Sequence, residues 1–264
     1  MNAESEHSML EARDLAIGYS KKGGSTTVAG NINFSIKKGE LVGLVGANGI
    51  GKSTLLRSLT GMQPHLKGKI FLDQKNLTTY SPFRLAAHLS VVLTETPASK
   101  NLSVLEMVSL GRQPYTNWIG SLSEKDTSAI QLALEATETD ALSHRKCFEL
   151  SDGQMQRVAI ARALAQDTPI IVLDEPTTHL DIYHRAYVLK LLRRLASETQ
   201  KTIVFSTHEI DLAIQLTDKM LVMTKNGTHF DAPCVLIEAG RFDVLFPKET
   251  IEFDAKTGRF TIRK

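Results

Sequence analysis

The fold is decided by the stretch Gly46-Ala47-Asn48-Gly49-Ile50-Gly51-Lys52-Ser53-Thr54. This stretch matches every defined position of the phosphate-binding pattern G-x-x-x-x-G-K-[ST]. The short apolar run from Leu41 to Val45 precedes it and is typical of a buried parallel strand. Leucines at helical spacing follow it, at positions 55, 56 and 59. The sequence therefore predicts a strand, a glycine-rich turn and a helix that together bind the phosphates of a nucleotide.

The residue types of this stretch suit a polyphosphate. A glycine-rich turn points backbone N–H groups inward, and the following helix N-terminus adds its partial positive charge. We expect Lys52 to reach the β- and γ-phosphates and Ser53 to bind Mg²⁺ through its hydroxyl. A glycine turn that merely joins a strand to a helix is the plainer alternative. It is disfavoured because Lys52 and Ser53 directly follow the last glycine.

A pair of carboxylates follows another apolar run, Ile170 to Leu173. Asp174 and Glu175 come where such a strand ends, and ligands of open α/β sheets bind at the carboxyl ends of the strands. Asp174 is therefore a candidate Mg²⁺ carboxylate, whereas a solvated surface pair is the alternative. The apolar run Thr202 to Ser206 leads to His208. A lone histidine at a strand end is usually structural, so its role depends on its neighbours.

The segment Leu150-Ser151-Asp152-Gly153-Gln154 resembles the signature of ATP-binding cassette (ABC) ATPases. The phosphate loop, this segment and Asp174-Glu175 follow one another in the order of that family. The resemblance covers nearly the whole chain. It implies an α/β fold, with a P-loop NTPase (RecA-like) core, an antiparallel β subdomain and an inserted α-helical subdomain. Residues 1–264 would form a single domain, with the core at 1–94 and 158–264 and the helical subdomain at 95–157.

The resemblance also implies roles for individual residues. Glu175 would polarise the water that attacks the γ-phosphate, and His208 would contact the γ-phosphate. Tyr19 falls where the family carries an aromatic ring that stacks on adenine; a half-buried tyrosine at a strand end is the alternative. Pro176 to Asp181 resembles the D-loop, which contacts the partner subunit. The residues implied to meet the ATP held by the opposite subunit are Ser151, Gly153, Gln154 and Asp181.

Two positions depart from the family pattern. Asp152 stands where the common signature has glycine, and a carboxylate beside a helix N-terminus is locally favourable although it brings negative charge near a phosphate site. Thr94 stands where the family usually has a glutamine that touches Mg²⁺ and water, with Glu95 next. We expect the Thr94 hydroxyl to take part in the metal site.

The remaining elements follow from sequence pattern. Strands are expected at Leu10 to Ile17 and at Thr27 to Ile36, around the polar turn Lys21 to Gly24. A helix is expected after Ser103, which begins a capping-box pattern, and a second helix opens at Ser123 to Asp126. Ser151 is expected to cap a helix that begins near Gln154. Further strands are expected near residues 68–73, 221–223 and 230, a short helix from residue 82 to 88, a helix at 209–217 and a hairpin at 251–262.

The stretch Gly111-Arg112-Gln113-Pro114-Tyr115 resembles the ATPases of iron–siderophore, haem and cobalamin importers. That resemblance implies a homodimer that closes on two ATP molecules, and transmembrane permease subunits that dock near residues 94–118. It also implies, indirectly, a periplasmic or surface substrate-binding protein. The expected location is peripheral, on the cytoplasmic face of the inner (cell) membrane. The solute is left open because its contacts lie in the other chains.

Composition adds limits to these expectations. The chain is 42% hydrophobic and 23% charged, which is ordinary for a globular protein. A net charge of +2 provides no argument for nucleic-acid binding. Cys147 and Cys234 have no metal-ligand or redox spacing, which fits a reducing compartment. No apolar run is long enough to cross a bilayer, and the polar N-terminus is unlike a secretory signal, so a transport component would need a partner that spans the membrane.

Two other functions remain open at this point. One is a soluble ABC ATPase that moves no solute, such as the iron–sulfur assembly type. The other is a nucleotide-binding regulator with little turnover, which only Thr94 and Asp152 suggest. The presence of both Glu175 and His208 argues against the regulator.

Overall fold

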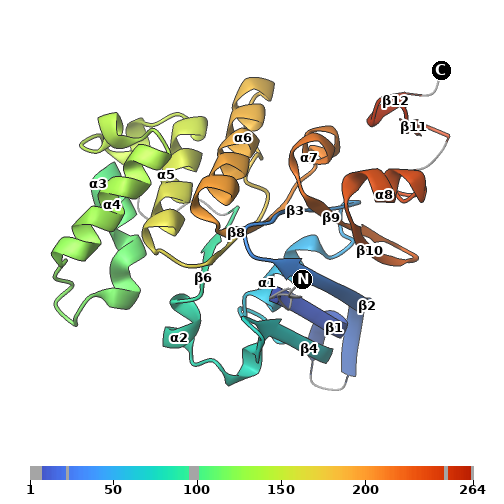
Figure 1. Cartoon of the computed structure of the whole chain (residues 1–264), viewed down its shortest axis with the longest axis horizontal. Coiled ribbons are helices and arrows are strands. Elements are labelled where there is room, and N and C mark those ends of the chain that lie inside the picture. Colours follow the sequence, from blue (N-terminus) through green and yellow to red (C-terminus); the bar gives the residue numbers. More distant parts are fainter. Residues whose placement is uncertain (1–7, 22–23, 95–100, 247–248, 263–264) are drawn as a thin grey trace, which may run out of the picture.

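A six-stranded sheet forms the centre of the molecule (Figure 1). The computed structural model describes residues 8–21, 24–94, 101–246 and 249–262. The strand order is β10-β9-β3-β8-β7-β6, with all pairs parallel except β9 with β10. The parallel strands β3, β7 and β8 therefore have their carboxyl ends at the same edge of the sheet. The strands are β3 (Leu41–Gly46), β6 (Leu89–Val92), β7 (Ile170–Leu173), β8 (Thr202–Ser206), β9 (Lys219–Thr224) and β10 (Gly227–Asp231).

A second, antiparallel sheet packs across helix α1 (Lys52–Leu59), as expected for the β subdomain. Its order is β2-β1-β4-β5, and the two long strands run well beyond the predicted ranges. Residues 22 and 23 of the predicted turn lie outside the described residues. The strands are β1 (Ser8–Lys21), β2 (Gly24–Lys37), β4 (Lys67–Leu72) and β5 (Lys75–Asn76).

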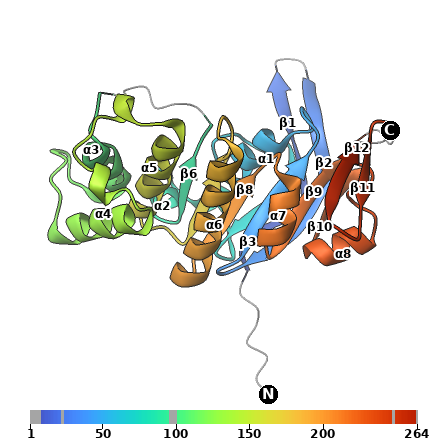
Figure 2. The same ribbon diagram turned by 90° about the horizontal axis from the view of Figure 1, so that it is seen from above.

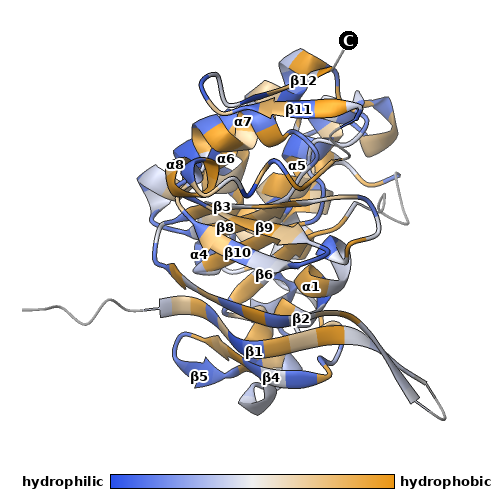
Figure 3. Cartoon of the chain, turned by 90° about the vertical axis from the view of Figure 1, so that its right-hand side faces the viewer, coloured by the Kyte–Doolittle hydropathy of each residue, from blue (hydrophilic) through white to orange (hydrophobic). Residues whose placement is uncertain are grey.

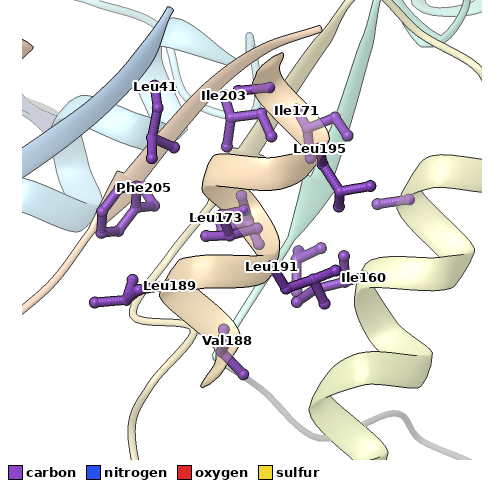
Figure 4. Close-up of a cluster of buried hydrophobic side chains, with 14 of the residues drawn as sticks. Leu41, Ile160, Ile171, Leu173, Val188, Leu189, Leu191, Leu195, Ile203 and Phe205 are labelled. Atoms are coloured by element: carbon purple, nitrogen blue, oxygen red, sulfur yellow. The ribbon is translucent and has the colours of Figure 1, made fainter. Parts of the chain in front are cut away.

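The two faces of the central sheet belong to two hydrophobic clusters, because successive side chains of a strand point to opposite faces. On β3, Val42 and Leu44 join α1 and the antiparallel sheet, whereas Leu41 and Val45 face the other helices. Helix α6 (Ile182–Thr199) covers that second face (Figure 2). Figure 4 shows its apolar stripe against the strands and α5, with labels on Val188, Leu191, Leu195, Leu173, Ile203, Phe205 and Ile160. The central strands are correspondingly apolar (Figure 3).

The inserted helical region lies at one end of the molecule (Figure 1). The predicted capping box forms at Ser103 with Glu106, and a second capping box forms at Ser123 with Asp126. The proposed subdomain boundary at residue 157 falls within α5, because this helix runs unbroken from the signature into the core. The helices are α2 (Pro82–Ala86), α3 (Val104–Ser109), α4 (Glu124–Ala136) and α5 (Asp152–Ala165), with 3₁₀ turns η1 (Leu77–Thr79), η2 (Leu110–Tyr115), η3 (Asp140–Leu142) and η4 (Cys147–Glu149).

The stretch Gly111 to Tyr115 has a structural function inside the helical region. A Cβ on Gly111 would lie 2.2 Å from the Arg162 carbonyl oxygen, so only glycine allows η2 this close to α5. The buried Arg112 donates to Asp126 at 2.7 Å and to the Ala165 carbonyl at 2.8 Å. Arg112 thus joins the first turn of α4 to the last turn of α5.

The C-terminal part packs beside the central sheet through α7 (Ile210–Leu216) and α8 (Pro233–Glu238). The predicted hairpin forms from β11 (Ile251–Asp254) and β12 (Arg259–Ile262). Phe253 anchors it by stacking on Phe242 at 5.1 Å between ring centroids and by contacting Phe260 at 4.9 Å. Of the helices in the described ranges, none combines the length and apolar character needed to cross a bilayer.

Candidate nucleotide-binding site

The predicted phosphate loop joins the carboxyl end of β3 to the first turn of α1. Gly51 precedes the helix with a φ of 111°, a conformation that a side chain rarely allows. A Cβ at this position would also meet the Val28 side chain at 2.5 Å. The first turn of α1 carries no acidic residue, so its free N–H groups remain suited to an anion.

Lys52 lies inside the loop rather than on the surface. Its side chain is 5% exposed, and Nζ donates to the Gly46 carbonyl at 3.0 Å and to the Ala47 carbonyl at 3.4 Å. Burial lowers the pKa of Lys52, and the carboxylates of Glu175 and Asp174 act in the opposite direction. The two acids thus favour the charged ammonium that a phosphate requires.

Asp174 and Ser53 form the candidate metal site. Asp174 is buried, and its Oδ1 accepts from Ser206 Oγ at 2.7 Å and from Ser53 Oγ at 3.2 Å. These are hard oxygen groups, the ligand type that Mg²⁺ prefers. A hydroxyl and one carboxylate also leave coordination positions for phosphate and water, as Mg²⁺ sites usually do. The donor set therefore fits Mg²⁺. Ser206 was not predicted to act here; the only signal was a polar residue that closes an apolar strand.

Glu175 and His208 meet at the adjoining strand ends. His208 Nε2 donates to Glu175 Oε1 at 2.8 Å, and Thr178 Oγ1 donates to Oε2 at 3.2 Å. The backbone of Glu175 has a φ of 49°, which is uncommon for a residue with a side chain and often marks a functional site. Its N–H is held by Ser206 Oγ at 2.8 Å. The carboxylate is thus fixed from both oxygens and from its own backbone.

Tyr19 closes one side of the site. It is 47% exposed, and its hydroxyl lies 3.1 Å from Thr54 Oγ1. A cavity of about 260 Å³ opens at this place. Val28 is part of its wall and was not predicted, because only the pairing of β1 with β2 brings it beside the loop. The lining consists of Tyr19, Val28, Asn48, Gly49, Gly51, Lys52, Ser53, Thr54 and Glu175.

Thr94 contacts the backbone of Asp174, one of the two residues of the candidate metal site. Its hydroxyl donates to the backbone carbonyl of Asp174 at 2.9 Å. The hydroxyl hydrogen is therefore engaged in a hydrogen bond to the backbone, and only the oxygen lone pairs of Thr94 remain available as acceptors. The neighbouring Glu95 lies outside the described residues.

The signature residues occupy a different surface. Ser151 caps α5 by accepting from the Gln154 N–H at 3.3 Å, and Gln154 Oε1 accepts from the Ser151 N–H at 3.1 Å. The helix begins at Asp152, two residues before the predicted start. Asp181 caps α6 by accepting from the backbone N–H of His184. Among the described residues, the lining of the cavity includes no signature residue and not Asp181.

Comparison with known proteins shows the family to which the chain belongs. Residues 29–178 match the family described as ABC transporter. The achromobactin transport ATP-binding protein CbrD of Dickeya dadantii (strain 3937) is 38% identical over 239 residues, or 90% of this chain and 87% of that protein. The petrobactin import ATP-binding protein FpuD of Bacillus anthracis is 40% identical over 214 residues, or 81% and 77%. The iron(3+)-hydroxamate import ATP-binding protein FhuC of Bacillus subtilis (strain 168) is 35% identical over 250 residues, or 94% and 89%.

Solved structures agree as well. CbiO1 from Clostridium perfringens, part of the ABC transporter complex cbiONQ, is similar with a TM-score of 0.77 and 30% identity, over 90% of this chain and 93% of that chain. The dimeric cassette MJ0796, in a post-hydrolysis state with ADP and Pi, is similar with a TM-score of 0.72 and 27% identity, over 85% and 99%. These likenesses confirm the predicted α/β P-loop fold. The chain therefore belongs to the ABC transporter family, among its ATP-binding proteins.

Proposed function

We propose that this chain is the ATP-hydrolysing subunit of a membrane importer for an iron–siderophore, haem or cobalamin-type solute. The observation that carries the catalytic part is the meeting of Glu175, His208 and the phosphate loop at one sheet edge. The solute class is supported by relatives named for achromobactin, petrobactin and iron(3+)-hydroxamate transport. ATP hydrolysis in this proposal powers the uptake.

The residues of the site divide the chemistry among them. The backbone N–H groups of the loop and the ammonium of Lys52 hold the β- and γ-phosphates. Glu175 takes the proton of a water whose oxygen attacks the γ-phosphorus, while the bond to the β-phosphate oxygen breaks and ADP leaves. His208 orients Glu175 through its ring N–H and contacts the γ-phosphate. Tyr19 stacks on the adenine. Positioning and charge neutralisation supply most of the rate enhancement.

A magnesium ion accompanies the nucleotide in this proposal. Ser53 and Asp174 would hold it, with Thr94 beside them through its remaining lone pairs. When bound, the ion neutralises charge on the β- and γ-phosphates. Ser206 keeps the Asp174 carboxylate in a single orientation by its hydrogen bond at 2.7 Å.

Two copies of the chain act together in the proposal. Ser151, Gly153 and Gln154 of one subunit meet the ATP held by the phosphate loop of the other, and Asp181 contacts the same site. Support comes from the separation of the signature from the cavity and from the dimeric form of MJ0796. Closure on two ATP molecules is the force-generating step, and hydrolysis resets the dimer.

The permease would dock between the core and the helical region, near residues 94–118. A cavity of about 460 Å³ lies between β6 on one side and helices α3 and α5 on the other. Its mixed apolar and polar wall suits a short amphipathic segment of a membrane subunit. The lining consists of Met62, Leu89, Val91, Val92, Leu93, Met107, Met155, Ala159, Arg162 and Gln166. Such docking places the chain peripherally on the cytoplasmic face of the cell membrane, with a substrate-binding protein acting on the other side.

The substitution Glu175→Gln tests the function. An amide cannot accept the proton of water, so we expect hydrolysis to fall by roughly a thousandfold or more while ATP binding persists. The variant should also accumulate as an ATP-bound dimer. Steady-state ATPase assays, a fluorescent-ATP titration and sedimentation measure the three quantities. Glu198→Gln, an exposed acid on α6, is the matched control. Near-normal turnover of Glu175→Gln would refute the proposal.

A further inference from the structure

His184 connects two segments that belong to different parts of the chain. Asp181 Oδ1 accepts from the backbone N–H of His184 and from its ring Nδ1, both at 2.8 Å. The two bonds lower the pKa of Asp181, and the carboxylate acceptor requires that Nδ1 carries a hydrogen. The imidazole is therefore held in one orientation by the residue that caps its own helix.

The other edge of the same ring lies against the signature helix. A Cβ on Gly153 would stand 2.6 Å from His184 Cδ2, 3.1 Å from Cγ and 3.3 Å from Nε2. Atoms in real structures essentially never come so close, so the ring and the Gly153 backbone are in direct contact and position 153 admits no side chain while the ring stays in place. Neither the phosphate loop nor the catalytic carboxylate takes part in this contact.

Neighbouring side chains hold the face of α6 that carries His184. Tyr183 packs edge-on against the imidazole, with 5.2 Å between ring centroids and an interplanar angle of 88°. One turn further, the Tyr187 hydroxyl donates to Glu138, which also pairs with Arg194 at 3.1 Å. Arg157 of α5 lies over the Tyr187 ring at 5.5 Å. The N-terminal half of α6 is thus tied to α5 and to Glu138, which follows the end of α4.

We propose that His184 is a positioning residue that fixes Asp181 and Gly153 of one subunit relative to each other, so that both are presented as one unit to the ATP of the partner subunit. This inference rests on the proposed function, in which both residues act across the dimer. Asp181 lies in the D-loop and Gly153 in the signature, and both segments are joined here by one ring. No residue that binds nucleotide within the same subunit is involved.

A series at position 184 separates the two contacts. His184→Asn keeps an N–H donor near Asp181 but lacks the ring against Gly153. His184→Phe keeps a ring but lacks the donor, and His184→Ala lacks both. We expect ATP affinity of the single subunit to stay within about twofold in all three, because the phosphate loop is untouched. We expect kcat to fall about ten- to a hundredfold in His184→Ala, and less in His184→Asn and His184→Phe.

Coupling to Gly153 gives a second readout. Gly153→Ala should displace the imidazole, so its effect on kcat should be smaller in the His184→Ala background than in the wild type, by about fivefold or more. His144→Ala, an exposed histidine of the helical region, is the control. Thermal melting of every variant shows whether it is folded, and only folded variants enter the cycle. A merely structural role would lower the melting temperature and leave the cycle additive.

The outcomes distinguish this inference from the function on which it rests. If wild-type turnover rises with subunit concentration and His184→Ala matches the wild type, the positioning role is wrong and the proposed function stands. Additive effects of His184→Ala and Gly153→Ala would likewise overturn the positioning role. If Glu175→Gln hydrolyses ATP normally, the proposed function itself fails, and this inference fails with it.

Discussion

His208 Nε2 donates a hydrogen bond to Glu175 Oε1 over 2.8 Å, across the ends of two neighbouring parallel strands. Strands β7 and β8 pair in register, with Leu173 opposite Phe205, so the residues that follow them arrive at the same sheet edge. Strand β3, which leads into the phosphate loop, pairs with β8 on its other side. Glu175, His208 and the phosphate loop are therefore brought together by strand order.

The pair predicts a graded response at position 208. His208→Ala should lower kcat by about a hundredfold or more, the usual cost of losing one well-placed donor to a developing charge. His208→Gln keeps an N–H donor at similar reach and should lose less. ATP affinity should stay within about threefold for both, because binding depends on the phosphate loop. ATPase kinetics with a fluorescent-ATP titration check this. Equal rates for His208→Ala and the wild type would show that Glu175 is oriented without the histidine.

We expect Lys52 to bind the ATP of its own subunit and Ser151 to contact the ATP of the partner subunit. Lys52→Ala removes the ammonium from the phosphate loop and should weaken ATP binding to the single subunit by about tenfold or more. Ser151→Arg places a large charged side chain at the tip of α5 and should block closure while ATP still binds to the single subunit. When the two variants are mixed, each mixed dimer has one intact composite site. Its phosphate loop comes from the Ser151→Arg subunit and its signature from the Lys52→Ala subunit.

The measurement is ATP affinity at low subunit concentration, followed by ATPase activity of each variant and of the mixture. We expect activity in the mixture and almost none in either variant alone. If Ser151→Arg lost ATP binding to the single subunit as severely as Lys52→Ala, the signature would act within its own subunit.

Substitutions of Thr94 test the hydrogen bond from its hydroxyl to the backbone of Asp174, a residue of the candidate metal site. Thr94→Val removes the hydroxyl that donates to the Asp174 carbonyl at similar side-chain volume, and should lower the free energy of unfolding by about 1 kcal/mol. Thr94→Ser keeps the donor and should behave as the wild type. Because Asp174 contacts Ser53, we also expect Thr94→Val to require more Mg²⁺ for half-maximal ATPase activity. An unchanged Mg²⁺ requirement in Thr94→Val would remove Thr94 from the metal site.

Asp126 should make stability depend on pH. Hydrogen bonds from the hydroxyl and N–H of Ser123, and the Arg112 guanidinium, lower the pKa of Asp126 from 3.8 to about 2, against the effect of burial. A carboxyl whose pKa is lower in the folded protein stabilises the fold above its ordinary pKa, and this contribution is lost as the pH falls through the interval between 3.8 and about 2. Asp126→Asn leaves Arg112 buried without its counter-ion.

We therefore expect Asp126→Asn to lower the free energy of unfolding at pH 6 by about 3 kcal/mol. The difference from the wild type should shrink as the pH falls from 3.8 to about 2, because the carboxyl of the unfolded wild type is protonated first and that of the folded protein only near pH 2. Urea unfolding at several pH values measures it. Glu124→Gln, an exposed acid in the same helical turn, should change stability by less than about 0.5 kcal/mol at every pH. A constant difference between Asp126→Asn and the wild type would contradict the assignment.

Much of the architecture could be predicted from sequence because its signals are local. The apolar run before Gly46 and the leucines after Lys52 define β3 and α1 through their periodicity alone. Serines followed three residues later by an acceptor define the helix starts at 103, 123 and 151 in the same way. The hairpin of β11 and β12 likewise follows from alternation around a glycine turn.

The packing contacts of the Gly111 to Tyr115 stretch could not be predicted from the sequence. Its pattern pointed to a class of transport ATPases, and a docking region nearby was inferred. The structure shows that Gly111 and Arg112 hold η2, α4 and α5 together, through a close backbone approach and a buried ion pair. Partners that lie 14 and 53 positions away cannot be read from a motif.

The sequence by itself determined the family and the phosphate-loop motif, and it predicted Glu175 and His208 as the catalytic pair, because these depend on residue types at short, defined spacings. Only the tertiary structure decided which distant residues support them. Ser206 orients Asp174 and the Glu175 backbone, Thr94 donates to a carbonyl rather than pointing outward, and His184 touches Gly153. Each of these contacts joins segments of different strands or helices, and sheet register and helix packing, rather than spacing along the chain, set their distances.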